Sequence, residues 1–327
     1  MSNTIKWGMI GAGDVTEVKS GPAFKKVEDS DLVAVMRRDP EKVKDYAKRH
    51  AVAKWYTDAQ ALINDEDVNA IYIATPPDTH YRYSLMALEA GKAVYVEKPM
   101  TLGTLEAKQL ADAVEKSSGR LTVAHYRRAQ PYFKKIKQLL LAGAIGEPRL
   151  VSLQMLKKPL SEHELNDPKI QWRLNAAKSG GGLFHDLAPH QLDFIYHLFG
   201  EIKELRGIST NQAKAYQADD VVSGQILFEN DVLFNGIWLF NADEERDSCE
   251  IIGSSGKLSF SFFSGDPVVL TNREGEQRFA FEPLQHVQQP MIAEVVAYLQ
   301  GKRDNPCSVT EGLTVMRIMD VFTGKPS

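Results

Sequence analysis

The 327-residue chain is poor in cysteine, with only Cys249 and Cys307. Two isolated thiols are typical of a reducing compartment, whereas secreted proteins of this size often carry several disulfides. The opening stretch MSNTIKWGMIGAG has no basic segment followed by a long apolar run and a small-residue cleavage site, so we expect no secretory leader. These features predict a cytoplasmic protein.

Long apolar runs and an excess of positive charge are also missing. No segment approaches the roughly 20 apolar residues needed to span a bilayer, which predicts that no membrane is involved. Lys and Arg number 39 against 43 Asp and Glu, so no general basic field would attract nucleic acid. Hydrophobic residues make up 43% of the chain. A single core rarely grows beyond roughly 250–300 residues, so we expect two domains.

Short apolar runs alternate with helical patterns at the start of the chain. Five runs have the character of buried strands, at residues 5–10, 32–36, 70–74, 93–96 and 121–124. Strands separated by helices are typical of βαβ units and of a parallel sheet covered on both faces. The pattern predicts an α/β fold for residues 1–125, a doubly wound (Rossmann) domain of about six strands.

From residue 126 the β-like runs follow one another with short turns. They lie at residues 148–156, 201–209, 221–228, 232–240, 248–252 and 257–262. Consecutive strands joined by turns such as Asn230-Asp231 indicate antiparallel pairing. Residues 126–327 are therefore expected to form an α+β domain with a mostly antiparallel sheet for substrate binding and oligomerisation. Residues 161–179 are polar and are expected to be irregular.

The turn after the first predicted strand is rich in glycine. Gly11 permits a tight turn, and Gly13 lets the backbone approach a pyrophosphate. A helix predicted over residues 15–27, interrupted by Gly21 and Pro22, offers backbone N–H groups. The third small position of this fingerprint is Thr16 instead of Gly or Ala. A lone Gly-x-Gly is often only a turn, but this one follows a strand and opens a βαβ series. It predicts dinucleotide binding by Gly11, Ala12, Gly13, Asp14 and Val15.

The end of the second predicted strand bears on the choice of dinucleotide. NAD-binding proteins usually have a carboxylate there for the ribose 2′-hydroxyl. This chain has Arg37 and Arg38, and an arginine fork suits the 2′-phosphate of NADP. We expect NADP as the cofactor. Two alternatives stay open: the arginines form a solvated loop, or the strand ends later and Asp39 serves NAD.

The end of the fourth predicted strand carries further candidates for the cofactor. Thr75, Pro76 and His80 lie where the adenosine or its ribose should pass. As an alternative, His80 is simply the first residue of a helix.

A glycine triplet precedes a predicted helix near residues 187–199, with Asp186 as its candidate N-cap. Asp186 and His190 are four residues apart and share one helix face. A carboxylate there can orient an imidazole and suit it to general acid–base catalysis. The alternative is a cap beside a surface histidine. His185 has no well-spaced third and fourth partners for a metal, so we expect no metal site.

Several motifs together resemble the glucose-fructose oxidoreductase / inositol dehydrogenase / MocA (Gfo/Idh/MocA) family. They are GAG at 11–13, ATPPDTH at 74–80, EKP at 97–99 and the Asp-x-x-x-His after GGG. The stretch HYRRAQPYFKKIKQLLLAGAIGEP, residues 125–148, resembles the family's start of the second domain. The likeness covers nearly the whole chain in order, and Thr16 is the departure from the pattern.

The resemblance implies a nicotinamide-dependent oxidoreductase acting on a sugar or cyclic polyol. It implies a large open sheet, one face of which often forms a dimer interface, and hence a homodimer or homotetramer. By the family pattern Lys98 and His190 flank the reacting carbon and Asp186 supports them. Glu97 and Pro99 would shape the loop, with a cis peptide between Lys98 and Pro99, and we count Glu97 and Lys98 among the cofactor-binding residues.

The expected chemistry assigns a role to each of the two central residues. The cofactor exchanges hydride, His190 handles the proton, and Lys98 stabilises alkoxide charge, although the two could exchange roles. Further candidates for the substrate site, with packing as the alternative, are Tyr126, Arg127, Trp172 and Arg173. Two other functions remain open. One is an NAD-dependent glycosidase, and the other is a nucleotide-sensing regulator without catalysis.

Overall fold

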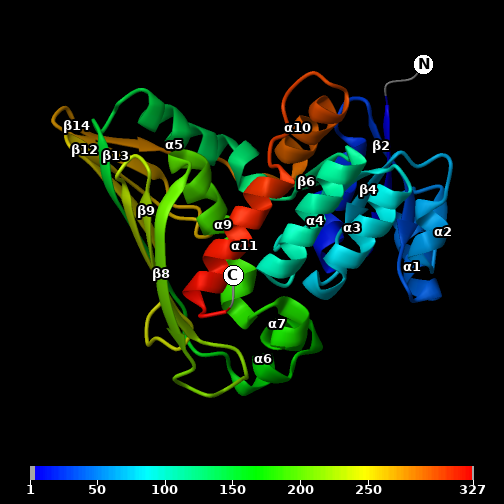
Figure 1. Ribbon diagram of the computed structural model, residues 1–327, viewed down its shortest axis with the longest axis horizontal. Helices are drawn as coiled ribbons and strands as arrows, with labels where there is room; N and C mark the ends of the chain where they lie inside the picture. The colour runs from blue at the N-terminus through cyan, green and yellow to red at the C-terminus, as the bar shows by residue number, and fades with distance from the viewer. Residues whose placement is uncertain (1–3, 326–327) are drawn as a thin grey trace. The chain divides into compact units, whose positions relative to one another are not determined.

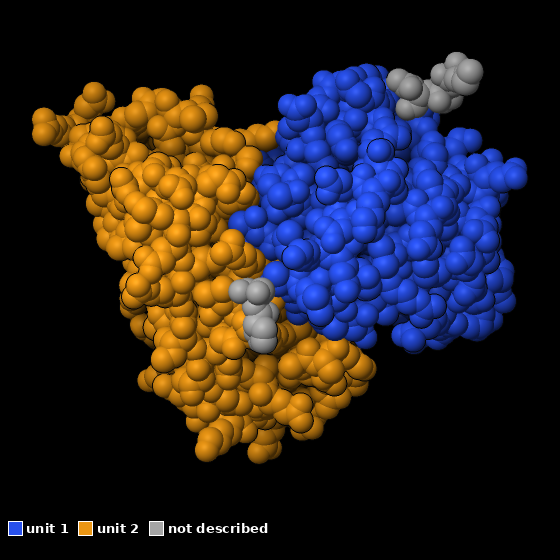
Figure 2. Space-filling view, in the orientation of Figure 1, with its two compact units in different colours: residues 1–130, 284–314 blue, residues 131–283, 315–327 orange. Residues whose placement is uncertain are grey.

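The computed structural model describes residues 4–325, which fold into two compact units (Figure 2). The first unit contains the chain up to residue 130 and residues 284–314, and the second contains residues 131–283 and the chain from residue 315. The first unit thus includes a segment from near the C-terminus, 284–314, that a division at residue 125 would assign to the second domain.

The first unit is built on a six-stranded sheet with every neighbouring pair parallel, in the order β3-β2-β1-β4-β5-β6. Its strands are β1 (Ile5–Ile10), β2 (Ser30–Met36), β3 (Lys54–Tyr56), β4 (Ala70–Ile73), β5 (Ala93–Val96) and β6 (Leu121–Val123). This order confirms the predicted doubly wound fold. The sequence gives no sign of β3 because this three-residue edge strand leaves Trp55 43% exposed and has no apolar run.

Helices α1–α4 connect the strands of this unit (Figure 1). Their bounds are α1 (Pro40–Arg49), α2 (Ala59–Ile63), α3 (His80–Glu89) and α4 (Thr104–Ser117), with short turns η3 (Pro77–Thr79) and η4 (Tyr126–Ala129). The interruption expected at Gly21 and Pro22, within the helical stretch of residues 15–27, is present in the structure. The chain forms a π-helical segment η1 (Thr16–Ser20) and a 3-10 segment η2 (Gly21–Lys25), because Pro22 has no N–H to continue a helix.

The segment 284–314 completes the first unit by covering the edge strand β6. Asn305 donates from its side chain to the Leu121 carbonyl at 2.7 Å, and the Val123 backbone nitrogen donates to the Cys307 carbonyl at 3.0 Å. Helix α10 (Gln289–Leu299) precedes this contact. An uncovered edge would invite pairing with another chain, so the returning segment protects the sheet.

The second unit is built on an eight-stranded sheet in the order β14-β13-β12-β11-β7-β10-β9-β8. Every pair is antiparallel except β7 with β10, which confirms the predicted mostly antiparallel sheet. The strands are β7 (Pro148–Leu156), β8 (Ile202–Thr210), β9 (Val221–Phe228), β10 (Leu233–Leu239), β11 (Arg246–Gly253), β12 (Gly256–Phe260), β13 (Val268–Asn272) and β14 (Gly275–Phe279).

Helices of the second unit lie on one face of this sheet (Figure 1), and aromatic rings pack between the two layers. Phe194 lies 4.8 Å from Phe133 and 6.3 Å from Phe260 between ring centroids, and Phe184 lies 5.1 Å from Trp238. The helices are α5 (Pro131–Leu141), α6 (Glu162–Asn166), α7 (Pro168–Leu174), α8 (Ala176–Ser179) and α9 (Gly182–Phe199). Helix α11 (Val309–Phe322) begins in the first unit and ends in the second.

Two expectations for the second unit are corrected by these bounds. The segment 161–179 is helical, because Ser161, Asp167 and Asn175 each cap the first turn of a short helix. Helix α9 starts at Gly182, since the Ser179 hydroxyl accepts the Gly182 N–H at 3.0 Å. No helix within residues 4–325 is long and apolar enough to cross a membrane.

Candidate active site

Five loops follow neighbouring strands of the first unit's sheet. The strands are parallel, so their carboxyl ends share one edge, which is where open α/β sheets bind ligands. These loops carry Gly11 after β1, Arg37 after β2, Thr75 after β4, Lys98 after β5 and Tyr126 after β6. The structure therefore brings the predicted cofactor residues of this unit to one edge of its sheet.

Gly11 determines how the chain leaves β1. Its φ is +102°, and a Cβ built there would lie 2.7 Å from the carbonyl carbon of Ala74 and 2.8 Å from the backbone nitrogen of Thr75. The backbone nitrogens of Gly11 and Ala12 both donate to the Met36 carbonyl, at 3.0 and 3.1 Å. Glycine is needed here for conformation and for space, because the loop passes directly between the ends of β2 and β4.

Gly13 lies at the open side of the same loop. A Cβ there would meet nothing nearer than 3.8 Å, so the space above this residue is a cradle that a side chain would fill. The buried Thr16 hydroxyl donates to the Gly13 carbonyl at 2.7 Å and lies 3.1 Å from its nitrogen. Thr16 thus closes the loop with contacts that Gly or Ala could not make. The open cradle fits the pyrophosphate of a dinucleotide.

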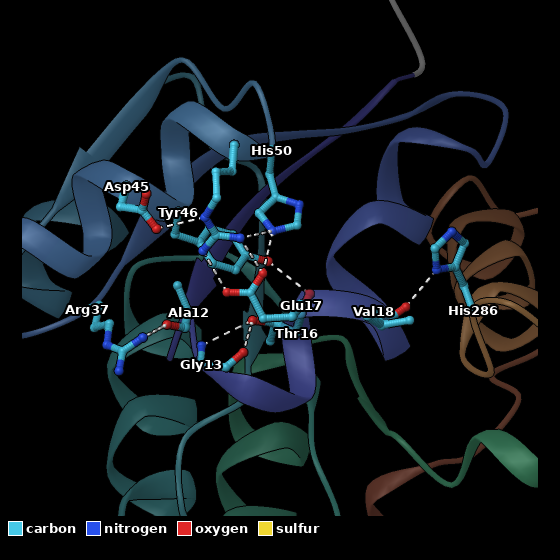
Figure 3. A network of polar contacts seen from close by, with 11 residues as sticks. Ala12, Gly13, Thr16, Glu17, Val18, Arg37, Asp45, Tyr46, His50 and His286 are labelled. Carbon is cyan, nitrogen blue, oxygen red and sulfur yellow. Dashed lines mark hydrogen bonds and ion pairs between the residues drawn. The ribbon is translucent and has the colours of Figure 1, made fainter.

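A polar network holds η1 against α1 (Figure 3). Arg49 forms a two-point pair with the Glu17 carboxylate at 2.7 and 2.8 Å, and His50 lies 2.8 Å from the same group. The Tyr46 hydroxyl donates to the Thr16 carbonyl at 2.9 Å. The hydrogen bonds from Arg49 are the main cause that lowers the pKa of Glu17 to about 2. The segment that follows the glycine loop is therefore fixed to its neighbour at neutral pH.

The two arginines at the end of β2 have different surroundings. Strand β2 ends at Met36, and Arg37 is half-buried with its guanidinium donating to the Ala12 carbonyl at 3.0 Å (Figure 3). Arg38 is exposed. Asp39 is the N-cap of α1, and the backbone N–H groups of that first turn are the main cause of its lowered pKa. Arg37 therefore supports the glycine loop, while the Arg38 side chain faces solvent.

His80 joins the loop after β4 to the loop after β5. It is buried, 1% exposed, and begins α3. Its ring nitrogens lie 2.7 Å from the Thr75 carbonyl and 2.9 Å from the Pro99 carbonyl. Burial lowers the pKa of His80, and the contacts with the two carbonyls shift this pKa in the opposite direction. His80 thus links two loops of the candidate cofactor site, whereas Pro76, four residues before it, is exposed.

Glu97 is the centre of a buried polar cluster under the EKP turn. The Tyr72 hydroxyl donates to the Glu97 carboxylate at 2.6 Å, and the Gln288 side-chain amide donates to the same oxygen. Gln288 also accepts from the Tyr95 hydroxyl at 3.1 Å, and Ser20 lies 3.0 Å from the Tyr72 oxygen. Burial, then the nearby Glu97 charge, raises the pKa of Tyr72 far above its usual range. Glu97 therefore points into the unit and anchors the turn.

Lys98 follows this anchor at the surface of the turn. Its backbone N–H donates to the Glu97 carboxylate at 3.2 Å, its side chain is half-buried, and the Lys98–Pro99 peptide is cis. The buried Glu97 carboxylate and the Gln288 side chain that binds it thus fix the geometry of the turn. Sequence reasoning missed Gln288, because a residue 191 positions away gives no local signal.

The loop after β6 carries the candidates Tyr126 and Arg127. Tyr126 is 8% exposed, and the Arg127 guanidinium lies 5.8 Å from the centre of its ring. The next residue, Arg128, is buried and pairs with Glu311 of the returning segment. Tyr126 is therefore mostly a packing residue in this unit, and Arg127 is the more accessible of the two candidates.

In the second unit, the glycine triplet and α9 position the other candidates. Asp186 lies in the second turn of α9 and is not its N-cap, because the helix begins four residues earlier. Its carboxylate is paired with Arg173 at 3.1 Å, and Arg173 lies over the Trp172 ring at 4.4 Å. The structure thus brings together three predicted site residues, Trp172, Arg173 and Asp186, that come from two helices.

Three histidines of α9 lie in different environments. His190 is 5% exposed, four residues after Asp186, with its ring centroid 5.9 Å from that of Phe263. His185 is fully buried and its Nδ1 lies 3.2 Å from the Gly181 carbonyl, and burial lowers its pKa to about 3. His197 lies 2.8 Å from Lys137. Among these three histidines, only His190 both follows a carboxylate, Asp186, by four residues and has an exposed side chain, Phe263, beside its ring.

These features define a class of protein: a dinucleotide-binding enzyme with a Rossmann unit and a second, mostly antiparallel unit. Two family models match the chain. Residues 5–125 match the oxidoreductase family with an NAD-binding Rossmann fold, and residues 133–259 match the GFO/IDH/MocA C-terminal domain. The chain belongs to the Gfo/Idh/MocA family of oxidoreductases, which confirms the resemblance in its sequence.

Individual relatives match over nearly the full chain. Oxidoreductase P35 of Formosa agariphila is 47% identical over 99% of this chain and 100% of its own length. The 1,5-anhydro-D-fructose reductase of Ensifer adhaerens is 24% identical over 95% of each chain. A solved structure of levoglucosan dehydrogenase with NADH and levoglucosan has the same fold, with a TM-score of 0.84 at 21% identity, covering 98% of this chain and 96% of that one.

Replacing Gln288 with leucine is expected to lower the free energy of unfolding by about 1–3 kcal/mol, because it leaves the Glu97 carboxylate and the Tyr95 hydroxyl short of buried partners. Urea denaturation of the full chain measures this. Gln285→Leu is the matched control, since Gln285 is exposed, and should change stability by no more than about 0.5 kcal/mol. Equal stability of the two variants would contradict the anchoring role.

Proposed function

We propose that this oxidoreductase transfers hydride between NADP(H) and the carbinol or carbonyl carbon of a sugar or polyol. The observation that carries the proposal is the set of groups at one sheet edge: an open glycine cradle, an exposed Arg38 and the anchored Lys98. Asp39, the carboxylate that could serve NAD, is engaged as the cap of α1. The exposed guanidinium supports recognition of a 2′-phosphate.

The names of two relatives support a carbohydrate substrate. One is a 1,5-anhydro-D-fructose reductase, and the other is a levoglucosan dehydrogenase solved with its sugar ligand. Both names describe oxidoreductases of cyclic carbohydrate compounds. Together with the membership in this oxidoreductase family, they favour a substrate with several hydroxyl groups and a reacting CH–OH carbon.

The residues of this chain would supply the remaining chemistry. The nicotinamide, when bound, supplies or accepts the hydride. Lys98 donates a hydrogen bond to the substrate oxygen and stabilises its developing negative charge. His190 takes or returns the proton of that oxygen, and Asp186, one turn before it on α9, supports it with negative charge. Glu97 keeps the Lys98 turn in place.

The proposal predicts a preference for NADPH over NADH that depends on Arg38. Arg38→Ala should weaken NADPH binding by about 10–100-fold and leave NADH binding unchanged, because a charge-assisted hydrogen bond contributes about 1.5–3 kcal/mol. Fluorescence titration of both cofactors measures this. Arg37→Ala is the comparison variant and should weaken both cofactors equally, since Arg37 holds the Ala12 carbonyl.

Turnover tests the reaction itself. A panel of carbonyl sugars and polyols, followed by nicotinamide absorbance with either cofactor, should give net reduction or oxidation. Tighter binding of NADH than NADPH by the unmodified protein would overturn the assignment of Arg38. Release of free sugar from a glycoside without net change of the cofactor would replace the proposal with a glycosidase.

A further inference from the structure

Phe263 is unusual among the phenylalanines of this chain. The chain has fourteen, all of them within residues 4–325, and Phe263 at 38% is the most exposed, while Phe279 and Phe281 are half-buried. Its neighbour Phe262 is 3% exposed and packs against Phe133 and Phe194, with ring centroids 5.4 and 6.0 Å away. The loop between β12 and β13 thus sends one ring into the core and presents the next ring outward.

The outward position of Phe263 is built into the loop. Asp247 of β11 accepts hydrogen bonds from the backbone nitrogens of Phe262 at 3.0 Å and Ser264 at 2.9 Å, and also from that of Phe263. The loop start is held as well, because the Ser261 nitrogen donates to the Tyr132 hydroxyl at 3.1 Å. A carboxylate that accepts hydrogen bonds from three consecutive N–H groups fixes the backbone from which the Phe263 ring projects.

The exposed ring lies next to the candidate acid–base residue of the same unit. The ring centroids of Phe263 and His190 are 5.9 Å apart and their planes are inclined by 72°, an edge-to-face contact. An apolar face beside a proton-transferring group combines the two elements of a small-molecule site: aromatic surface for affinity and a few polar groups for orientation.

We propose that Phe263 is an aromatic floor of the substrate site and that it recognises the C–H face of a cyclic polyol or sugar. The face of an aromatic ring is negative and attracts the positively polarised C–H bonds of such a ring. A cyclic compound presents these bonds together on one face, whereas an open-chain polyol must first lose rotational freedom. This inference rests on the proposed function and adds to its site a residue that would recognise the substrate ring.

The proposal is tested by binding, independently of turnover. Saturation-transfer NMR is measured on the full chain with its nicotinamide cofactor present, using levoglucosan and myo-inositol as ring probes and D-glucitol as the open-chain probe. We expect the ring probes to bind at millimolar concentration. Phe263→Ala should weaken their binding by about tenfold and leave D-glucitol unaffected, while Phe263→Tyr, which keeps the aromatic face, should retain the affinity.

Controls separate a binding role from a structural one. Leu141→Ala removes an exposed apolar side chain elsewhere in this unit and should change neither binding nor thermal stability. If neither ring probe binds, or if Phe263→Ala weakens ring and open-chain probes alike, the proposal is overturned. Failure of this proposal can be told apart from failure of the proposed function. Full turnover by His190→Ala would refute the acid–base role, but it would not change how Phe263→Ala affects the binding of the ring and open-chain probes.

Discussion

Alanine in place of His190 is expected to lower kcat by about 10²–10⁴-fold while NADPH binding stays unchanged. The expected loss is large because this variant removes the group proposed to exchange the proton of the substrate oxygen. The cradle proposed for the dinucleotide lies in the other unit, so cofactor binding should not change. Steady-state kinetics on the best substrate of the panel and a cofactor titration measure the two effects. Added imidazole should restore part of the rate, since it can replace a missing proton carrier.

A matched control for this variant lies on the same helix. His197 follows Asp193 with the same spacing as His190 follows Asp186, but its ring lies against Lys137. His197→Ala should keep the full rate. Lys98→Met, which removes the ammonium group and keeps the length, should also lower kcat strongly. If both residues act on one step, the double variant should lose little more than the worse single variant. Full activity of His190→Ala would refute the assignment.

The sequence predicted the first unit well because its signals are local. A buried parallel strand needs a continuous apolar run, and the loop that follows carries the chemistry, so Gly11, Arg38 and Lys98 could be assigned to strand ends directly. The short edge strand β3 has neither signal. Strand β14 was missed for a similar reason: four of its five residues are exposed, and no apolar alternation marks it. Strand β13 was also missed, although Val268 and Leu270 are buried in it.

Contacts between distant segments could not be predicted. The sequence indicated that Glu97 shapes its loop, but its partners Tyr72 and Gln288 are 25 and 191 positions away. Asp186 pairs with Arg173, which lies 13 positions before it on another helix and which spacing alone did not suggest. The early start of α9 had no sequence signal, because its N-cap is Gly181, which has no side chain to cap the helix.

The glycine loop offers the other large effect, through a comparison of two substitutions. Gly11→Ala should destabilise the protein by about 1–3 kcal/mol and abolish dinucleotide binding, because its φ is +102° and the new Cβ would be forced against the Ala74 backbone at 2.7 Å. Gly13→Ala should leave the melting temperature unchanged, since nothing lies within 3.8 Å of its Cβ position, yet weaken NADPH binding at least tenfold by filling the cradle.

A third glycine separates backbone strain from loss of the cradle. Gly91, at the end of α3, also has a positive φ of +69° but has nothing within 4 Å of its Cβ position. Gly91→Ala should therefore cost stability, about 1 kcal/mol, without affecting NADPH. Thermal melts and cofactor titrations of the three variants give a pattern: Gly11 affects both properties, Gly91 only stability and Gly13 only binding. Normal NADPH affinity in Gly13→Ala would show that the pyrophosphate does not lie in this cradle.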